Sequence, residues 1–321
     1  MKKSRLLAIV LAVLLLVFSF SLSACDNRQV IGILKYGNHE SLNNCYIGIE
    51  KGLKEGLGDS FDDYKIEVLD ANFDSSVSQA NANALVNKNP IIIGSISTPT
   101  TLSAITASAG RVPIVFSAVS DPYSKDIALD SYDYVTGTRD LLDFESGLLV
   151  VKTFLPNVEK IGVMVSNQEQ NSISQLESFK KVCSSQNITV VEARVNATNE
   201  IPMSVDKLIS KDIDCIFNLN DNTIVGALDV ILERANEANI PVFGSEIEQV
   251  KKGCLASASL DYIELGRITG LMMSDIILKK KDIKDMPFSE ISDSFLCYNS
   301  SVMKSLGLVV DGLDAFTDVA R

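Results

Sequence analysis

Short runs of apolar residues alternate with segments of helical periodicity along the first half of the chain. The apolar runs predict strands, and the segments between them repeat apolar residues three or four positions apart, as helices do. The predicted strands cover residues 30–36, 66–71, 91–96 and 112–116, and the predicted helices cover 42–57, 77–86 and 102–109. Continuous β-branched runs separated by helices are typical of parallel βαβ units, so we predict an α/β fold.

The same alternation begins again near residue 160. Strands are predicted at 161–165, 189–193, 215–219 and 242–244, and helices at 172–184, 205–209 and 225–238. Two pairs of segments also match at nearly the same separation. Ile31-Gly32-Ile33 resembles Ile161-Gly162-Val163, and residues 112–116 resemble residues 240–243. We therefore predict two similar, doubly wound parallel-sheet lobes.

The remaining elements are too few for a third domain and are expected to complete the two sheets. They comprise strands at 256–260 and 295–298 and helices at 263–278 and 301–306. The chain would then cross between the lobes more than once, which makes a multi-strand hinge with a ligand cleft beside it. The predicted division is a signal segment 1–24, a tether 25–29, an N-terminal lobe 30–143 plus 261–285, and a C-terminal lobe 144–260 plus 286–321.

The first 25 residues have the pattern of an export signal. Residues 1–5 are basic, residues 6–18 form an unbroken apolar run, and Leu22-Ser23-Ala24-Cys25 follows. The apolar run is short for a membrane-spanning helix. The ending resembles the lipobox of bacterial lipoproteins, and this resemblance implies cleavage before Cys25 and a thioether-linked diacylglycerol on Cys25. The alternative is an ordinary signal peptide with a nearby cysteine. With the lipobox, the mature protein is extracytoplasmic and anchored to the membrane by acyl chains.

Composition and charge argue against several classes of binding partner. The chain has 46% hydrophobic and 22% charged residues and a net charge of −12, as in an acidic globular protein. A surface of this sign disfavours nucleic acid and anionic lipid headgroups, so membrane attachment depends on lipid. The single histidine, His39, argues against most metal sites and histidine-based triads, and we expect no metal and no cofactor.

The cysteines show no metal-binding or disulfide pattern. Apart from Cys25, five cysteines remain, which is an odd number, and no two of them form a CxxC pair. Cys215 and Cys297 lie in strand-like runs, where buried cysteines act as small apolar residues. We therefore expect these thiols to lie in the core.

Polar residues follow nearly every predicted strand. In open parallel sheets ligands bind outside the carboxyl ends of the strands, so these residues are candidates for a ligand site. The candidates are Ser97, Thr98, Asp121, Asn171, Ser172, Asp221, Asn222 and Asp261. The three aspartates are possible counter-charges for an ammonium group, and the alternative is that they are solvated loop carboxylates. Thr98, Ser172 and Asn222 equally suit helix N-caps. His39 is expected at a pocket rim or on the surface.

Several of these motifs together resemble one family. They are Ser120-Asp121-Pro122 at the end of residues 112–122, Asn220-Asp221-Asn222-Thr223, residues 240–243 and 253–256, and Asp261-Tyr262 with Thr269-Gly270. This set resembles ABC transporter substrate-binding proteins of the tryptophan/tyrosine type, over about residues 30–307. The resemblance implies a type I periplasmic-binding-protein fold and polar contacts from the candidate residues to an amino-acid-like ligand. The first loop differs, because many members have Glu-His-Pro where this chain has Asn38-His39-Glu40.

The resemblance favours a transport receptor. By this hypothesis the chain captures a small ligand, expected to be an aromatic amino acid, and delivers it to an ABC permease with its ATPase subunits. A receptor coupled to a membrane signalling protein is the alternative. An enzyme is the weaker alternative, because no nucleophile–base pair is visible. Tyr36, Phe116 and Tyr123 are possible walls for an aromatic ring, and each is equally possible in the core or on the surface.

Overall fold

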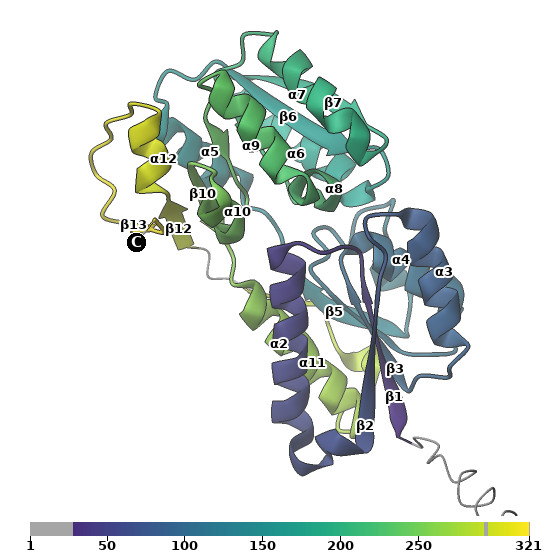
Figure 1. The fold of residues 1–321 in the computed structure, drawn as a ribbon. Helices are drawn as coiled ribbons and strands as arrows, with labels where there is room; N and C mark the ends of the chain where they lie inside the picture. Colours follow the sequence, from purple (N-terminus) through teal and green to yellow (C-terminus); the bar gives the residue numbers. More distant parts are fainter. Residues whose placement is uncertain (1–27, 292–294, 321) are drawn as a thin grey trace, which may run out of the picture.

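The computed structural model describes residues 28–291 and 295–320, which form two α/β lobes joined by several crossings of the chain (Figure 1). The α/β class and the two parallel-sheet lobes predicted from the sequence are confirmed. The signal segment and Cys25 lie outside the described residues. Within the described part, no helix combines the length and the apolar character needed to span a bilayer.

The first lobe is a six-stranded parallel sheet in the order β11-β5-β4-β3-β1-β2. Its strands are β1 Gln29–Lys35, β2 Tyr64–Asp70, β3 Ile92–Ile96, β4 Ile114–Ser117, β5 Val135–Arg139 and β11 Ser289–Glu290. Its helices are α2 Glu40–Leu57, α3 Ser75–Val86, α4 Thr98–Ser108 and α11 Tyr262–Ile277, with 3₁₀ turns at Gly58–Asp63, Leu129–Ser131 and Ile283–Asp285. Both faces of the sheet are buried. Ile31 and Ile33 pack under α2 and α11, whereas Leu34 packs under α3 and α4.

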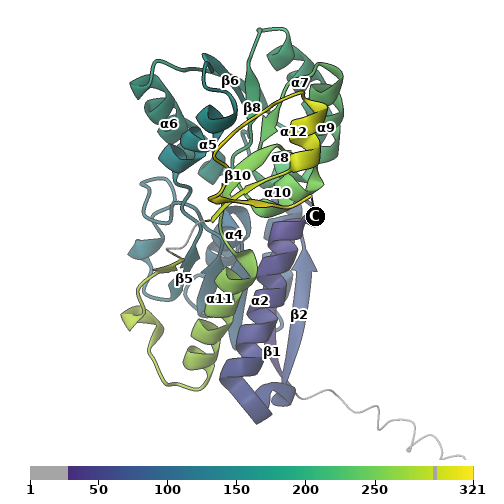
Figure 2. The same cartoon turned by 90° about the vertical axis from the view of Figure 1, so that its left-hand side faces the viewer.

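Helices α2 and α11 lie side by side along one face of this sheet (Figures 1 and 2). Glycines allow the two helix backbones to approach closely. A Cβ atom on Gly48 would overlap the Ile263 carbonyl oxygen, and one on Gly266 would overlap the Cys45 carbonyl oxygen. The interface therefore fixes the start of α11, which directly follows a crossing between the lobes.

The second lobe contains a four-stranded parallel sheet in the order β7-β6-β8-β9. Its strands are β6 Lys160–Ser166, β7 Thr189–Val195, β8 Cys215–Phe217 and β9 Val242–Phe243. The Leu255 N–H donates to the Val242 carbonyl, and this bond joins β9 to a three-stranded sheet, β10-β12-β13. The strands of that sheet are β10 Ala256–Ser259, β12 Phe295–Tyr298 and β13 Phe316–Asp318.

Helices cover the second lobe on both sides of its sheet. They are α5 Phe144–Phe154, α6 Gln170–Ser185, α7 Ile201–Ile209, α8 Asn222–Gly226, α9 Leu228–Glu237, α10 Ile247–Lys252 and α12 Ser300–Ser305, with a 3₁₀ turn at Thr198–Glu200. The prediction of a single helix over residues 225–238 is wrong, because two helices cover this segment. The helical segment begins earlier, because Asp221 caps it, and it is interrupted at Ala227, where φ is −107° and ψ is 18°.

The chain passes between the lobes at residues 140–143, at residues 260–261 and after β11. The boundary predicted after residue 285 needs correction. Ser289 and Glu290 pair with Thr138 and Arg139 of β5, and the Thr136 hydroxyl donates to the Met286 carbonyl. Residues 286–290 therefore belong to the first lobe, where they cover the otherwise open edge of β5.

Cysteines 45, 183, 215, 254 and 297 are all buried and unpaired with one another. Cys215 and Cys297 lie in β8 and β12, as their strand-like surroundings predicted. Burial raises the pKa of the Cys45 thiol and of the Cys254 thiol, so these thiols remain protonated. They act as small apolar residues of the core.

Candidate ligand-binding site

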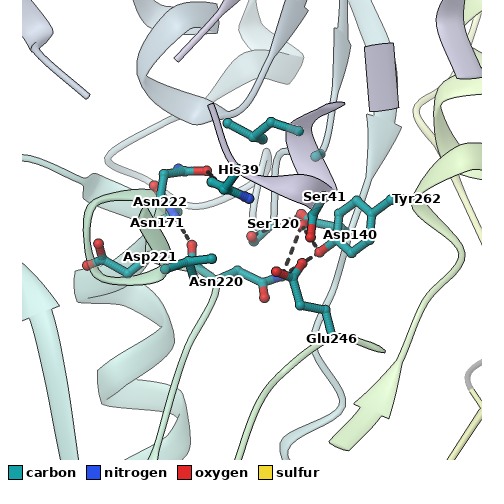
Figure 3. Close-up of a pocket in the computed structure, with 13 residues that line it drawn as sticks. His39, Ser41, Ser120, Asp140, Asn171, Asn220, Asp221, Asn222, Glu246 and Tyr262 are labelled. Carbon is teal, nitrogen blue, oxygen red and sulfur yellow. Dashed lines mark hydrogen bonds between the residues drawn. The ribbon is translucent and has the colours of Figure 1, made fainter. Parts of the chain in front are cut away.

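A small polar cavity, called the inner cavity below, lies between the lobes at the carboxyl ends of the strands (Figure 3). Its volume is about 20 Å³, which is room for one water-sized group. Its lining residues are His39, Ser41, Leu42, Ala118, Ser120, Asp140, Asn171, Asn220, Asp221, Asn222, Val225, Glu246 and Tyr262. Residues of both lobes and of the first crossing therefore face one cavity.

The second-lobe wall is held by two buried acids, Glu169 and Asp221. The Glu169 carboxyl accepts hydrogen bonds from the backbone N–H and the side chain of both Asn222 and Thr223. The Asp221 carboxyl accepts from the Ile224 N–H at 3.0 Å and from the Ser166 N–H at 2.6 Å. These contacts satisfy N–H groups at the start of α8, which explains why the helix begins at Asn222.

Burial raises the pKa of Glu169, and the nearby charge of Asp221 raises it further. Burial also raises the pKa of Asp221. Each of the four carboxyl oxygens of this pair already accepts a hydrogen bond from the protein. The pair therefore organises the loop and leaves little hydrogen-bonding capacity for a ligand.

Asp140 occupies the first crossing and joins both lobes. Its carboxyl accepts from the Ser120 hydroxyl at 3.0 Å, the Asn220 amide at 3.0 Å and the Tyr262 hydroxyl at 2.9 Å. Ser120 follows β4 of the first lobe, Asn220 follows β8 of the second lobe, and Tyr262 begins α11. Burial raises the pKa of Asp140 to about 6, and these three donors favour its ionised form. Asp140 is thus a carboxylate that joins the two lobes.

Glu246, which follows β9, is the second acid at this end of the cavity. It is 3% exposed, and its Oε1 has no hydrogen-bond partner among the described residues. Burial raises its pKa to about 7. A buried carboxylate oxygen without a donor is costly, so this oxygen is available for a ligand.

His39 reaches across the cleft from the loop before α2. Its Nε2 lies 3.2 Å from Asn222 Oδ1. Because the Asn222 amide nitrogen donates to Glu169, its Oδ1 is an acceptor, and His39 Nε2 must be the donor. Burial lowers the pKa of His39 to about 4, so the ring is neutral and Nδ1 carries a lone pair. Nδ1 is buried and, within the described part of the chain, has no partner.

The unpaired atoms around the inner cavity include several acceptors. Asn171 donates its amide N–H to the Asn220 carbonyl at 2.8 Å, so its Oδ1 is left without a partner, as are His39 Nδ1 and Glu246 Oε1. Among the residues that the structure describes, no lysine or arginine lines this cavity. A group of hydrogen-bond donors with a positive charge, such as an ammonium, complements such a cavity.

Three of the predicted site residues line the inner cavity, namely Asn171, Asp221 and Asn222. Ser97, Thr98 and Ser172 are buried close to strand ends but outside its lining. Asp121 is half-buried, and it accepts a hydrogen bond from the Ser174 hydroxyl of α6 at 3.0 Å. This bond links the first lobe to the second at the edge of the cleft.

The structure corrects the expectation for Asp261. Its side chain is exposed and accepts hydrogen bonds from the Ile263 and Glu264 N–H groups at the start of α11. It is a helix cap outside the cavity, and Asp140 supplies the carboxylate at this end instead. The aromatic walls proposed from the sequence also lie elsewhere. Tyr36 and Phe116 are fully buried in the first-lobe cores, and Tyr123 is 50% exposed.

Sequence reasoning missed Asp140, Tyr262 and Glu246 as site residues. Asp140 was missed because it follows the strand Val135–Arg139, which contains no apolar run that would predict a strand. Tyr262 lies in the Asp-Tyr motif and Glu246 in a loop after a predicted strand, so the signal for both was present. What the sequence left open was which of two neighbouring polar residues faces the cleft.

The chain belongs to the family of ABC transporter substrate binding proteins, which it matches over residues 30–312. Members are solute-binding proteins of ABC transporters and not enzymes. The sequence is 30% identical over 284 residues to a protein of Clostridioides difficile named tyrosine-binding protein, covering 88% of this chain and 81% of that protein.

Two solved structures of substrate-binding proteins are similar to the chain. A Streptococcus pneumonia ABC domain in complex with L-Trp aligns with a TM-score of 0.82 and 29% identity, covering 88% of this chain and 96% of that chain. A ligand-free, open substrate-binding protein from Clostridium difficile is also 29% identical and aligns with a TM-score of 0.65. The alignment covers 90% of this chain and 99% of that chain. In this chain, His39 bonds to Asn222, Ser174 to Asp121 and Asn44 to Glu248, and these three contacts join the two lobes across the cleft.

Proposed function

We propose that this protein captures an aromatic amino acid between its lobes and delivers it to an ABC permease. The observation that carries the proposal is the inner cavity, where buried acids and unpaired acceptors converge without a basic residue. An α-ammonium is the part of an amino acid that fits such a site. The two relatives support the aromatic class, because one is named for tyrosine and the other holds L-Trp.

We assign the ammonium to Glu246 Oε1, His39 Nδ1 and Asn171 Oδ1, with Asp140 supplying further negative charge. For the α-carboxylate we retain Ser97 and Thr98 as the proposed partners. Both lie at the start of α4, and their buried hydroxyls have no partner in the described residues. The Ser97 N–H donates to the Ser117 carbonyl, beside Ala118 and Ser120 of the cavity wall. A helix N-terminus with free hydroxyls suits a carboxylate.

A ligand panel tests this function. A ligand that binds only the folded state at a thousandfold excess over its Kd stabilises it by about 4 kcal/mol. Thermal unfolding should therefore shift upward with L-tyrosine or L-tryptophan. The N-acetyl amino acids should give no shift, because they lack the ammonium, and the amino acid amides should give a weaker one. Stabilisation by sugars or nucleosides alone would exclude the proposed ligand class.

We also propose that Cys25 anchors the protein to the membrane by lipid. A thioether requires sulfur, so Cys25→Ser should abolish incorporation of labelled palmitate and release the protein from the membrane fraction. The wild-type protein, washed with high salt to remove electrostatic adsorption, is the control. A Cys25→Ser protein that remains on membranes after this wash would contradict the anchor, while leaving the ligand proposal untouched.

A further inference from the structure

Phe73, in the loop between β2 and α3, adopts a backbone conformation that bulky residues rarely take. Its φ is 61°, and that of the preceding Asn72 is 49°, so both residues lie in the left-handed region. Tyr36, which follows β1, holds the loop in this form. The Phe73 N–H donates to the Tyr36 carbonyl at 2.8 Å, and the Tyr36 hydroxyl donates to the Phe73 carbonyl at 3.4 Å. Such a conformation persists only where the surroundings impose it, and it is frequent at binding sites.

The Phe73 ring packs against glycines of both lobes. Gly37 follows β1 in the first lobe, and Gly226 ends α8 in the second lobe. A Cβ atom on Gly37 would overlap the Phe73 ring, and one on Gly226 would lie 2.8 Å from Phe73 Cζ. The absence of a side chain at both positions therefore makes room for the ring. Phe73 thus makes an apolar contact across the cleft, in addition to the hydrogen bonds that join the lobes.

The same ring stacks on His39. The two ring planes are 5° apart and the ring centroids are separated by 6.1 Å. A flat neighbour parallel to the imidazole restricts the broad rotation that its terminal torsion otherwise allows. In this orientation His39 Nε2 reaches Asn222 Oδ1 of the second lobe at 3.2 Å. His39 lines the inner cavity and Phe73 does not, so Phe73 can act on that cavity through His39.

We propose that Phe73 is a positioning residue for His39. Its ring holds the imidazole in the orientation that reaches Asn222, and its contact with Gly226 makes this orientation depend on the approach of the second lobe. The inference rests on the proposed function, because it takes His39 to belong to the ligand site.

Calorimetric titration with L-tyrosine and L-tryptophan tests this role. Phe73→Ala should weaken binding about tenfold or more, because His39 loses the ring that orients it. Phe61→Ala is the matched control. Phe61 is a half-buried phenylalanine of the same lobe, and its 3₁₀ turn Gly58–Asp63 precedes β2, whereas Phe73 follows β2. Its removal should change Kd by less than about twofold. An unchanged Kd in Phe73→Ala would overturn the proposal.

A double-mutant cycle determines whether Phe73 acts through His39. His39→Gln keeps a side chain that forms hydrogen bonds but removes the ring. In that background Phe73→Ala should weaken binding by less than about threefold, because no imidazole remains to be oriented. An undiminished loss of affinity in the His39→Gln background would show that Phe73 acts independently of His39, and it would overturn the proposal.

Gly226→Ala tests the contact from the second lobe and leaves the first lobe unchanged. The added Cβ atom would displace the Phe73 ring. Helix α8 itself should not suffer, because alanine is a better helix former than glycine. We expect Kd to rise about tenfold in Gly226→Ala, and we expect little further change when Phe73→Ala has already removed the ring. An unchanged Kd in Gly226→Ala would contradict the contact between Phe73 and the second lobe.

The single histidine of the chain allows a test that needs no ligand. Burial lowers the pKa of His39 to about 4. Smaller effects come from its bond across the cleft and from the charges of Lys35, Lys252 and Asp70. In untagged Phe73→Ala protein, water should reach the ring, and an NMR titration should show a pKa above about 5. Phe61→Ala should leave it unchanged. If the wild-type protein bound no amino acid, the proposed function would fail, whereas an unchanged His39 pKa in Phe73→Ala would overturn the positioning role.

Discussion

The cleft contains two groups of buried acids, and they differ in what their oxygens contact. Glu169 and Asp221 accept hydrogen bonds from Ser166 and from the residues that begin α8, all of them in the second lobe. Asp140 instead accepts from residues of both lobes, and Glu246 keeps one oxygen without a partner among the described residues. Burial raises the pKa of a carboxyl in each group. A raised pKa therefore does not distinguish a structural acid from a binding acid, whereas the location of its partners does.

The largest effect on folding is expected from Glu169→Ala. This change leaves two backbone N–H groups and two side-chain donors of Asn222 and Thr223 without their acceptor. Unsatisfied buried donors cost about 1–3 kcal/mol each, so the free energy of unfolding should fall by about 3 kcal/mol or more. Denaturant unfolding measures it. Glu177→Ala, at an exposed position of α6, the helix that follows Glu169, is the control, with an expected change within about 0.5 kcal/mol. Equal stability of the two variants would show that the Glu169 contacts are dispensable.

The largest effect on binding is expected from Asp140→Ala. The change removes a negative charge beside the proposed ammonium and breaks the bonds to Ser120, Asn220 and Tyr262 that join the two lobes. Loss of one partner of a buried charged pair costs about 2–5 kcal/mol, which corresponds to about thirtyfold or more in Kd. Calorimetric titration with the native ligand measures this change.

Asp143→Ala is the matched control for Asp140→Ala. Asp143 lies three residues further on, is exposed, and caps α5 through the Glu145 and Ser146 N–H groups. Its loss should reduce stability by about 1 kcal/mol and leave Kd unchanged. If Asp140→Ala binds as tightly as Asp143→Ala, Asp140 takes no part in binding.

The stability of the free protein and its affinity for the ligand should depend on pH in opposite directions because of Glu246. Glu246 has its pKa raised to about 7, so the folded state holds a proton that the unfolded chain has lost. Its contribution to the stability of the free protein is present at low pH and is lost as pH rises through 7. Binding of an ammonium needs the carboxylate and releases this proton. Affinity should therefore rise from pH 6 to 8. The stability of the free protein should fall over the same range, and the raised pKa of Glu169 contributes to this fall.

The titration of His39 limits the pH range in which unfolding and binding should be measured. Its pKa is lowered to about 4, so the ring is neutral in the folded state throughout the range from pH 6 to 8. The unfolded chain binds a proton at His39 only below about pH 6.5, and this adds a small opposite slope at the acidic end. Unfolding and titration between pH 6.5 and 8 avoid it. A Kd that is constant over this window would contradict an ammonium–carboxylate contact at Glu246.

The fold was largely predictable because its strands are buried on both faces. Ile92–Ile96 and Cys215–Phe217 are apolar runs that a parallel sheet requires, and their spacing predicted two lobes. Strand Val135–Arg139 was missed because threonine and glycine alternate with few apolar residues. The strand Ser289–Glu290 was missed because it has only two residues and both are polar, and this omission moved the predicted lobe boundary.

The site was less predictable, because the residue type does not determine whether a side chain faces the cavity or the solvent. Asp221 and Asp261 both follow a strand and precede a helix, and both cap that helix. Only Asp221 lines the cavity, whereas the side chain of Asp261 is exposed and lies outside it. Asp140 shows no motif in the sequence, and its importance comes from partners about 80 and 120 residues away. Such long-range pairing is a property of the folded chain.

The smallest effect is expected from Asp261→Ala, and it sharpens the distinction between capping and binding acids. Asp261 accepts hydrogen bonds from the Ile263 N–H at 2.9 Å and the Glu264 N–H at 3.0 Å, and its side chain is exposed. Loss of an N-cap costs about 0.5–2 kcal/mol of stability. The neighbouring Tyr262 hydroxyl keeps its bond to Asp140, so Kd should change less than twofold. Asp261→Asn, which preserves the capping oxygen, should restore most of the stability. If Asp261→Ala weakened binding as strongly as Asp140→Ala, α11 would be positioned by its cap, and capping and binding would be coupled through Tyr262.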